Sequence, residues 1–472
     1  MKYLLPVAGL AVLIVLCSLA LAGTAVVHGA GRSQPAGVPV WGTDIRVNPP
    51  VTSTADIKLN FLFAVNPSNA NQVLAPYETE DSTATRSGYA WSTDAGRTWD
   101  PKLFYGPWIS NTTPAGNPSG GFDSRGTAYY ASAVAGDNVS GYVVLTSTVG
   151  GNWSAPLPII LTDTLHFRSQ ARLIVDGRSS GAFAGSLYIA WHDSTQTPGG
   201  IGLRYSRDSG RTWSADVPVS DPGHETAEQP ILAVAADGGV YAAFGADDTN
   251  LYLNHSTDGG VTWGADQPIA GDTITPIGAL DPKGRERLLS SGQPDSGFLI
   301  NNDPRIALAP AAPETVYAVW NDGRWDSGFT LFSHPGQHGD IAFSRSTDAG
   351  ATWSAPLRIN DDVVKNGVDQ WAPNIAVGTD GRIGVTWYDR RDDPAHLLYH
   401  LYYSESTDGG LTWSANTRVS DVPSDPMAVV DAKGNGLLGD YAGLAFAPAY
   451  ALASWVDSRA GRVHDFYADR GA

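Results

Sequence analysis

The 472 residues carry 48 acidic and 30 basic side chains, and the resulting net charge of −18 argues against a general nucleic-acid or anionic-lipid partner. The content of 53 Gly, 31 Pro, 15 Trp and 19 Tyr is typical of an all-β chain with many turns. The single cysteine, Cys17, lies in an apolar N-terminal run. Disulfides, a thiol catalyst and a cysteine-ligated zinc site are therefore excluded from the rest of the chain.

The apolar run extends from Leu4 to about Val27. A bilayer span needs roughly 20 residues, so the run is long enough for a membrane anchor. Ala20-Leu-Ala22 offers the small-x-small pattern of a signal-peptide cleavage site. Residues 1–30 are therefore predicted to be a signal peptide or an N-terminal membrane anchor. Either alternative exports the rest of the chain, so we expect a secreted or cell-surface protein whose only membrane contact is this segment.

Residues 31–43 are rich in Gly, Ser, Pro and Ala and are predicted to be a linker. Residues 44–472 are predicted to form one folded domain, because a repeated phrase runs through them. Repeat architectures relax the usual expectation of two or three domains for this length.

The repeated phrase reads Ser-x-Asp-x-Gly-x-Thr-Trp. Five good copies end at Trp99, Trp213, Trp263, Trp353 and Trp413. One degenerate copy, in which Thr148 replaces the Asp, ends at Trp153. Asp followed by Gly favours a tight turn, because the carboxylate accepts bonds from nearby N–H groups and Gly supplies a positive φ. Apolar and aromatic alternation on the flanks predicts strands, so each copy closes a β-hairpin, which we expect its Trp to cover. The acids predicted to be structural turn locks are Asp94, Asp208, Asp258, Asp348 and Asp408.

This phrase resembles the Asp-box, or BNR repeat, of sialidase-like β-propellers. The resemblance spans nearly the whole exported part of the chain. It implies an all-β ring of blades, in which each blade is an antiparallel sheet and the Asp-box joins its third and fourth strands.

Blades can be counted from a second landmark, a strand that ends in Trp-x-Asp. It occurs four times, at 191–193, 320–322, 387–389 and 455–457. Three weaker equivalents lie at 73–77, 128–131 and 241–244. Seven such strands predict seven blades, and six blades, the number typical of sialidases, are the alternative.

The last repeat ends before a fourth strand. Ile45-Arg-Val-Asn48 reads like Leu357-Arg-Ile-Asn360, which is a fourth strand that follows an Asp-box. The N-terminal strand is therefore predicted to complete the last blade and close the ring, which leaves only short sheet edges.

Loops alternate between the two ends of an antiparallel blade. The loops after Trp-x-Asp and the loops between blades therefore share the end opposite the Asp-boxes, where propellers of the family it resembles generally bind ligands. A long insertion, at about residues 271–300, lies in a loop of that end and is predicted to act as a rim or lid.

The resemblance implies a first function, hydrolysis of sialosides. Sialidases hold the substrate carboxylate with an arginine cluster and use a Tyr nucleophile, a Glu that activates it and an Asp as acid/base. From loop position, the hypothesis assigns these catalytic roles to Tyr441, Glu228 and Asp369. The arginines expected to bind substrate are Arg305, Arg390, Arg391 and Arg459.

One departure weakens the sialidase assignment. The early strand at 57–63 lacks the Arg-Ile-Pro motif of sialidases, and Arg305-Ile306 is followed by Ala307 in a later blade. The second candidate function is therefore non-catalytic binding of a glycan or a protein by the propeller. Trp371 is expected to stack on sugar rings, as are Trp325 and Tyr441, unless these aromatic side chains pack between blades. A third function is hydrolysis of another polysaccharide by paired carboxylates.

The Trp-x-Asp acids have two interpretations, as site residues or as caps that pair with an Arg or a backbone N–H of a neighbour. No cofactor is expected. Asp392 with Asp393, or Asp361 with Asp362, could join a structural calcium site, although no spacing matches an EF-hand loop. His334 and His338 alone are too few for zinc. A glycan or glycoconjugate is the expected partner, and the sequence does not predict the oligomeric state.

Overall fold

A computed structural model of the chain divides into two compact units, Met1–Ala36 and Gly37–Ala472. The described residues all belong to the second unit and are 38–49, 57–59, 63–80, 85–148, 150–162, 168–193, 200–224, 226–246, 250–271, 279–280, 286–289, 297–299, 303–325, 338–428, 442–461 and 465–472. The predicted signal or anchor segment and most of the predicted linker lie outside them. Among the described residues, no helix is long and apolar enough to span a membrane.

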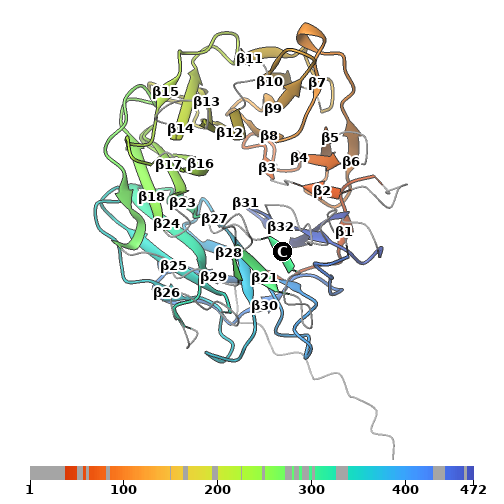
Figure 1. Ribbon diagram of the computed structural model, residues 1–472, viewed down its shortest axis with the longest axis vertical. Coiled ribbons are helices and arrows are strands. Elements are labelled where there is room, and N and C mark those ends of the chain that lie inside the picture. The colour runs from red at the N-terminus through yellow and green to blue at the C-terminus, as the bar shows by residue number, and fades with distance from the viewer. Residues whose placement is uncertain are drawn as a thin grey trace, which may run out of the picture. The chain divides into compact units, whose positions relative to one another are not determined.

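The second unit is an all-β propeller in which seven antiparallel sheets follow one another in chain order (Figure 1). Blade 1 contains β2 (Ile57–Leu59), β3 (Ala64–Val65), β4 (Val73–Glu80), β5 (Thr85–Ser92) and β6 (Asp100–Leu103). Blade 2 contains β7 (Thr113–Pro114), β8 (Ser119–Phe122), β9 (Ala128–Ala135), β10 (Ser140–Ser147) and β11 (Leu157–Thr162). Blade 3 contains β12 (Arg168–Val175), β13 (Leu187–Asp193), β14 (Gly200–Ser206) and β15 (Val217–Pro218).

The next three blades have four strands each. Blade 4 contains β16 (Glu228–Val234), β17 (Val240–Ala246), β18 (Asn250–Ser256) and β19 (Gln267–Pro268). Blade 5 contains β23 (Arg305–Ala309), β24 (Ala312–Asp322), β25 (Asp340–Ser346) and β26 (Leu357–Arg358). Blade 6 contains β27 (Gln370–Val377), β28 (Ile383–Asp389), β29 (His400–Ser406) and β30 (Thr417–Arg418).

Blade 7 combines the two ends of the propeller, and its strands are β31 (Gly443–Ala447), β32 (Tyr450–Asp457), β33 (Asp465–Gly471) and β1 (Ile45–Arg46). Two short 3-10 turns, η1 (Ile109–Asn111) and η2 (Ile269–Gly271), follow outer strands. The described part of the long insertion forms a separate small sheet of β20 (Ala279–Leu280), β21 (Glu286–Leu289) and β22 (Gly297–Leu299). Its role as a rim or lid stays a prediction.

The innermost strands form an unbroken ring. Contacts run from β3 to β8, β12, β16, β23, β27 and β31 in turn, and β31 contacts β3 again. Figure 1 shows the first blade, in red and orange, beside the last blade, in blue. The prediction of seven blades is confirmed, and the alternative of six is wrong because seven complete sheets make the circuit.

The N-terminal strand closes this ring as predicted. Ile45 pairs with Ala468 and Arg46 with Tyr467, so β1 is the fourth strand of blade 7. Trp41, just before β1, packs edge-on against Tyr403 of blade 6 at a centroid distance of 5.1 Å. The Asp-box residue Trp413 packs in the same way against Phe343 of blade 5, at 5.0 Å. The N-terminal segment therefore supplies the tryptophan that an Asp-box supplies elsewhere.

The Asp-box turns are locked by their own side chains. In blade 6, Asp408 accepts hydrogen bonds from the N–H of Thr412 (2.9 Å) and from its hydroxyl (2.6 Å), and Ser406 Oγ accepts one from the N–H of Gly410 (2.8 Å). The same bonds recur in the other four good copies, around Asp94, Asp208, Asp258 and Asp348. These hydrogen bonds lower the pKa of Asp408 to about 2 despite opposing desolvation. The acids thus act within their own turns, whereas Trp413 covers the preceding blade rather than its own hairpin.

Candidate functional site

The second strand of each blade ends opposite the Asp-boxes, because the Asp-box follows the end of the antiparallel third strand. In blades 5, 6 and 7 this strand ends in a repeated three-residue lock. The indole N–H of a Trp donates to the carboxylate two residues later, and an Arg two residues after that donates to the same carboxylate. The members are Trp320–Asp322–Arg324, Trp387–Asp389–Arg391 and Trp455–Asp457–Arg459. The Trp-x-Asp acids of these blades are therefore structural caps.

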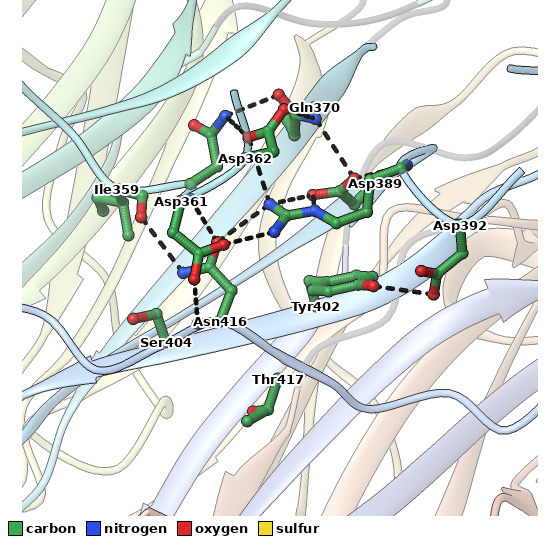
Figure 2. Close-up of polar contacts among 12 residues, drawn as sticks. Ile359, Asp361, Asp362, Gln370, Asp389, Asp392, Tyr402, Ser404, Asn416 and Thr417 are labelled. Atoms are coloured by element: carbon green, nitrogen blue, oxygen red, sulfur yellow. Dashed lines mark hydrogen bonds and ion pairs between the residues drawn. The ribbon is translucent and has the colours of Figure 1, made fainter. Parts of the chain in front are cut away.

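Arg391 is the centre of a polar network at this end. Its guanidinium donates to Asp389 at 2.9 Å, to Asp361 at 2.5 Å and to Asn416 at 3.0 Å. Figure 2 shows these acceptors around one guanidinium group, with the ring of Tyr402 beside it. Burial raises the pKa of Asp389, although the charge and hydrogen bonds of Arg391 oppose the rise. Removing Arg391 would leave a fully buried carboxylate without its counter-ion.

A second layer of this network joins blade 5 to blade 6. Arg358 donates to Asp340 at 2.5 Å and to Asp362 at 2.8 Å. The Asn360 amide donates to the same two carboxylates and to the side-chain oxygen of Gln370, each at 2.7 Å. The predicted calcium ligand Asp362 is thus held by side-chain donors, and Figure 2 shows it between Gln370 and the guanidinium group.

The other predicted calcium pair also has partners. Asp392 accepts a hydrogen bond from the hydroxyl of Tyr402 at 2.8 Å. Asp393 accepts from the N–H groups of Leu397 and Leu398, each at 2.8 Å. Across the described ranges, no group of three or more His, Cys, Asp or Glu residues is arranged to hold a metal ion.

Asp369, the predicted general acid, lies in a buried ion pair. It binds Arg390 Nη1 at 2.9 Å and His338 Nδ1 at 3.1 Å. Burial opposes its ionisation, but the bond from His338 and the positive charge of Arg390 outweigh burial and lower the pKa of Asp369. A carboxyl group that has already lost its proton is poorly suited to donate one.

Trp371 differs from the expectation of an exposed stacking surface. Its side chain is 2% exposed and contacts Tyr388 and Tyr399 at centroid distances of 5.6 Å. The Arg390 guanidinium lies 5.3 Å from the Trp371 ring. Trp371 lies in a buried cluster that also contains Leu444 and Trp455 of blade 7, so it packs between blades, the alternative left open by the sequence.

Three of the four predicted arginines are bound to different carboxylates. Arg390 binds Asp369, Arg391 binds the network around Asp389, and Arg459 binds Asp457 and, through the N-terminal segment, Asp44. Arg305 begins the innermost strand β23 of blade 5 and is half-buried. The structure therefore brings Asp369, Arg390 and Trp371 together, while Arg391 and Arg459 belong to the locks of two successive blades.

Glu228 begins the innermost strand of blade 4, and its side chain is 55% exposed. His192, at the end of β13 in blade 3, lies 3.9 Å from it. Burial lowers the pKa of His192, an effect that the charge of Glu228 opposes. The next residue, Gln229, has a positive φ and donates its N–H to the side chain of Gln170, so a bulge sets the direction of Glu228. Tyr441, the predicted nucleophile, lies outside the described residues.

Sequence reasoning missed several members of these clusters. Arg358, Asn360 and Asn416 carry much of the network, and His338 is the partner of Asp369. A signal was present, because Trp-x-Asp-x-Arg occurs in three successive blades and predicts an acid that pairs with its own Arg. No local pattern marks the partners that come from the neighbouring blade.

No known protein family and no curated protein matches this sequence. Among solved structures, the chain is similar to an alpha-L-arabinanase of Penicillium chrysogenum (13% identity, 92% of this chain and 98% of that chain, TM-score 0.44). It is also similar to an alpha-L-arabinofuranosidase of Fusarium graminearum (12%, 91% and 97%, TM-score 0.46) and to a Trypanosoma rangeli sialidase (10%, 87% and 70%, TM-score 0.41). The repeats and the ring of seven blades make the chain a β-propeller.

Proposed function

We propose that this chain is an exported propeller that binds neutral glycans at the end opposite the Asp-boxes and does not cleave sialosides. The ligand class follows from the Asp-box resemblance. The preference for neutral over acidic glycans rests on one observation, the ion pairs that the candidate arginines already form. Arg390, Arg391 and Arg459 each bind a buried carboxylate of the protein.

A sialoside carboxylate would have to compete with these internal carboxylates. Asp389 and Asp457 have fully buried side chains, and Asp369 is nearly buried. Taking the guanidinium from a buried pair leaves an uncompensated charge, which costs about 3–5 kcal/mol in measured cases. The net charge of −18 also repels an anionic ligand. A neutral sugar meets neither penalty.

A second candidate function, hydrolysis of a neutral glycoside, is favoured by one observation. Glu228 is a solvent-exposed carboxylate that lies beside an imidazole at the same end of the ring. A glycosidase needs an accessible acid or base that reaches the glycosidic oxygen. Asp369 does not meet this requirement, because it is buried, ionised and ion-paired.

The test is to screen the purified chain on an array of neutral and sialylated glycans and to assay fluorogenic neutral glycosides and a sialoside in parallel. We expect binding to neutral glycans and no sialoside turnover. Neutral turnover that disappears in Glu228→Gln would establish the second candidate. The matched control is Glu314→Gln. Glu314 lies near the start of β24, at the Asp-box end of the blade and therefore away from the proposed site. Sialoside turnover that is lost in both Tyr441→Phe and Arg459→Ala would overturn the proposal.

A further inference from the structure

The segment that joins blade 1 to blade 2 lies at the end of the propeller opposite the Asp-boxes. β6 is the outermost strand of blade 1 and begins directly after the Asp-box residue Trp99, so it runs toward the opposite end. β7, the next strand, pairs with Val134 and Ala135, which finish the second strand of blade 2 at that same end. The segment between them, residues 104–112, is called the 104–112 loop below. It therefore lies at the proposed glycan-binding end.

This loop carries an aromatic ring that faces solvent. Tyr105 is 72% exposed, whereas every other Phe, Tyr and Trp side chain of the described residues is buried or half-buried. Two of the three aromatic side chains that the sequence singled out for stacking are covered to different extents, since Trp371 is buried and Trp325 is half-buried. Tyr105 escaped notice in the sequence because no repeat marks a single aromatic residue in a loop.

The exposure of Tyr105 follows from the packing of its neighbour. Phe104 donates its N–H to the carbonyl oxygen of Ser87 at 3.0 Å, which extends the pairing of β6 with β5 by one residue. The Phe104 ring contacts Tyr130 at a centroid distance of 4.8 Å and Tyr89 at 5.2 Å. Successive side chains of an extended backbone point to opposite faces. Because Phe104 packs inward, Tyr105 faces outward.

The rest of the loop is tied down without help from this phenol ring. Trp108 donates its N–H to the carbonyl oxygen of Thr112 at 2.6 Å and so closes a short turn. Inside the turn, Ser110 and Asn111 have φ angles of 53° and 59°. Left-handed backbone is unfavourable for residues other than glycine, and such strain is found most often at ligand-binding and catalytic sites. The loop thus holds Tyr105 in place and leaves its ring uncovered.

The charges near the loop exclude an acidic ligand. Residues 104–112 contain no charged side chain. In the preceding strand, Lys102 forms an ion pair with Asp100 at 2.8 Å, so its charge is already matched. The neighbouring hairpin loop, residues 136–139, contributes one charged side chain, the exposed Asp137. A carboxylate of a sugar would meet an acid here and no unmatched cation, whereas a neutral sugar meets no repulsion.

Uncharged polar groups lie beside the ring as well. The hairpin loop packs against the turn of the 104–112 loop, since a Cβ atom at Gly136 would lie 3.4 Å from the carbonyl oxygen of Asn111. Ser110, Asn111 and Asn138 are all exposed at this place. Hydroxyl and amide groups both donate and accept hydrogen bonds, as sugar hydroxyl groups do. Apolar contact area with a few polar groups at its edge is the usual composition of a small-ligand site.

We propose that Tyr105 forms a stacking subsite for a neutral sugar ring at the outer edge of blade 1. The inference rests on the proposed binding of neutral glycans and adds a contact point on a different blade from Glu228. A sugar ring has an apolar C–H face and a polar edge of hydroxyl groups. Tyrosine matches the apolar face with a large, rigid ring that loses little conformational entropy on binding.

The first test compares variants on the neutral glycan array and then, by calorimetry, on the neutral oligosaccharide that the wild type binds best. We expect Tyr105→Ala to weaken binding roughly tenfold or more, because the ring no longer covers the sugar. Tyr105→Phe should bind like the wild type, because the ring and not the hydroxyl group makes the contact. The matched control is Leu411→Ala, at a residue that is 61% exposed but belongs to an Asp-box, and it should leave binding unchanged.

The second test locates the subsite without a substitution. Tetranitromethane nitrates exposed phenol rings, and mass spectrometry of peptides measures the rate at each tyrosine. We expect a saturating concentration of the same oligosaccharide to slow the nitration of Tyr105 markedly.

The outcomes separate this inference from the proposed function. Wild-type glycan binding that is unchanged in Tyr105→Ala, or nitration of Tyr105 that bound glycan does not slow, would overturn the subsite and leave the proposed function standing. No glycan binding by the wild type would overturn both. Slower nitration at high protein concentration without glycan would assign Tyr105 to a contact between copies of the chain and would also overturn the subsite.

Discussion

The Asp-box glycine predicts a measurable contact between blades. Gly410 has φ +84°, and a Cβ atom at this position would lie 2.2 Å from Cζ of Phe343 in the preceding blade. Phe343 is buried and also packs against Trp413, so it has little room to move. Gly410→Ala therefore combines an unfavourable backbone conformation with a collision inside the interface between blades.

A control in the same blade separates these two costs. Gly381 has the same φ of +84°, and nothing lies within 4 Å of the Cβ position. A left-handed non-glycine residue costs about 1–2 kcal/mol, which is the expected effect of Gly381→Ala. Overpacking a filled core costs about 1–3 kcal/mol more. We therefore expect Gly410→Ala to destabilise the protein by about 2–5 kcal/mol.

The assay is urea unfolding followed by tryptophan fluorescence, with both variants compared with the wild type. The difference between the two variants measures the contact alone, because their backbone conformations match. Equal destabilisation by Gly410→Ala and Gly381→Ala would refute the argument that the box glycine is required for packing between blades.

Two further predictions concern charged groups. Burial raises the pKa of Asp469 to about 6, so between about pH 4 and 6 the folded state holds a proton that the unfolded state has lost, and stability falls as pH rises. Asp469→Asn should flatten this part of the urea stability profile and raise stability at pH 7 by about 1–3 kcal/mol, and an unchanged slope would contradict this reasoning. Arg391→Ala should lower the free energy of unfolding by about 3–5 kcal/mol, because it leaves Asp389 buried without its counter-ion. Arg418→Ala, at an exposed position, should lower it by less than about 1 kcal/mol. Equal losses in the two variants would mean that the lock does not stabilise blade 6.

The ring could be predicted from the sequence because its information is local. The Asp-box turn is specified within eight residues, and the strand pattern on each side has a period of two. Even the closure was readable, since Ile45-Arg-Val-Asn48 repeats the pattern of a known fourth strand. These features depend on backbone conformation and on the turn residues, and neither requires knowledge of the neighbouring blade.

The site was harder to predict because its partners come from distant parts of the chain. Asp361 and Asn416 meet at Arg391, although they are separated by most of blade 6. Loop position correctly placed Asp369 and Arg390 at one end, but it could not show that they neutralise each other. A charged residue is a candidate for binding only when its own fold leaves it available, and that depends on every neighbour.

The junction between blades 3 and 4 shows how a repeat departs from its pattern without losing its link. Asp221 and Asp266 each accept the other's backbone N–H, at 2.9 and 2.7 Å, as Asp361 and Asn416 do between blades 5 and 6. His224 stacks on Tyr252 at 4.1 Å and binds Asp266.

His224 therefore takes the place that Arg391 holds over Tyr402 in blade 6. A link between these blades survives even though the lock arginine is gone, so the loss of arginine in this region is compensated. The space over Tyr252 is therefore filled by an imidazole group instead of a guanidinium group.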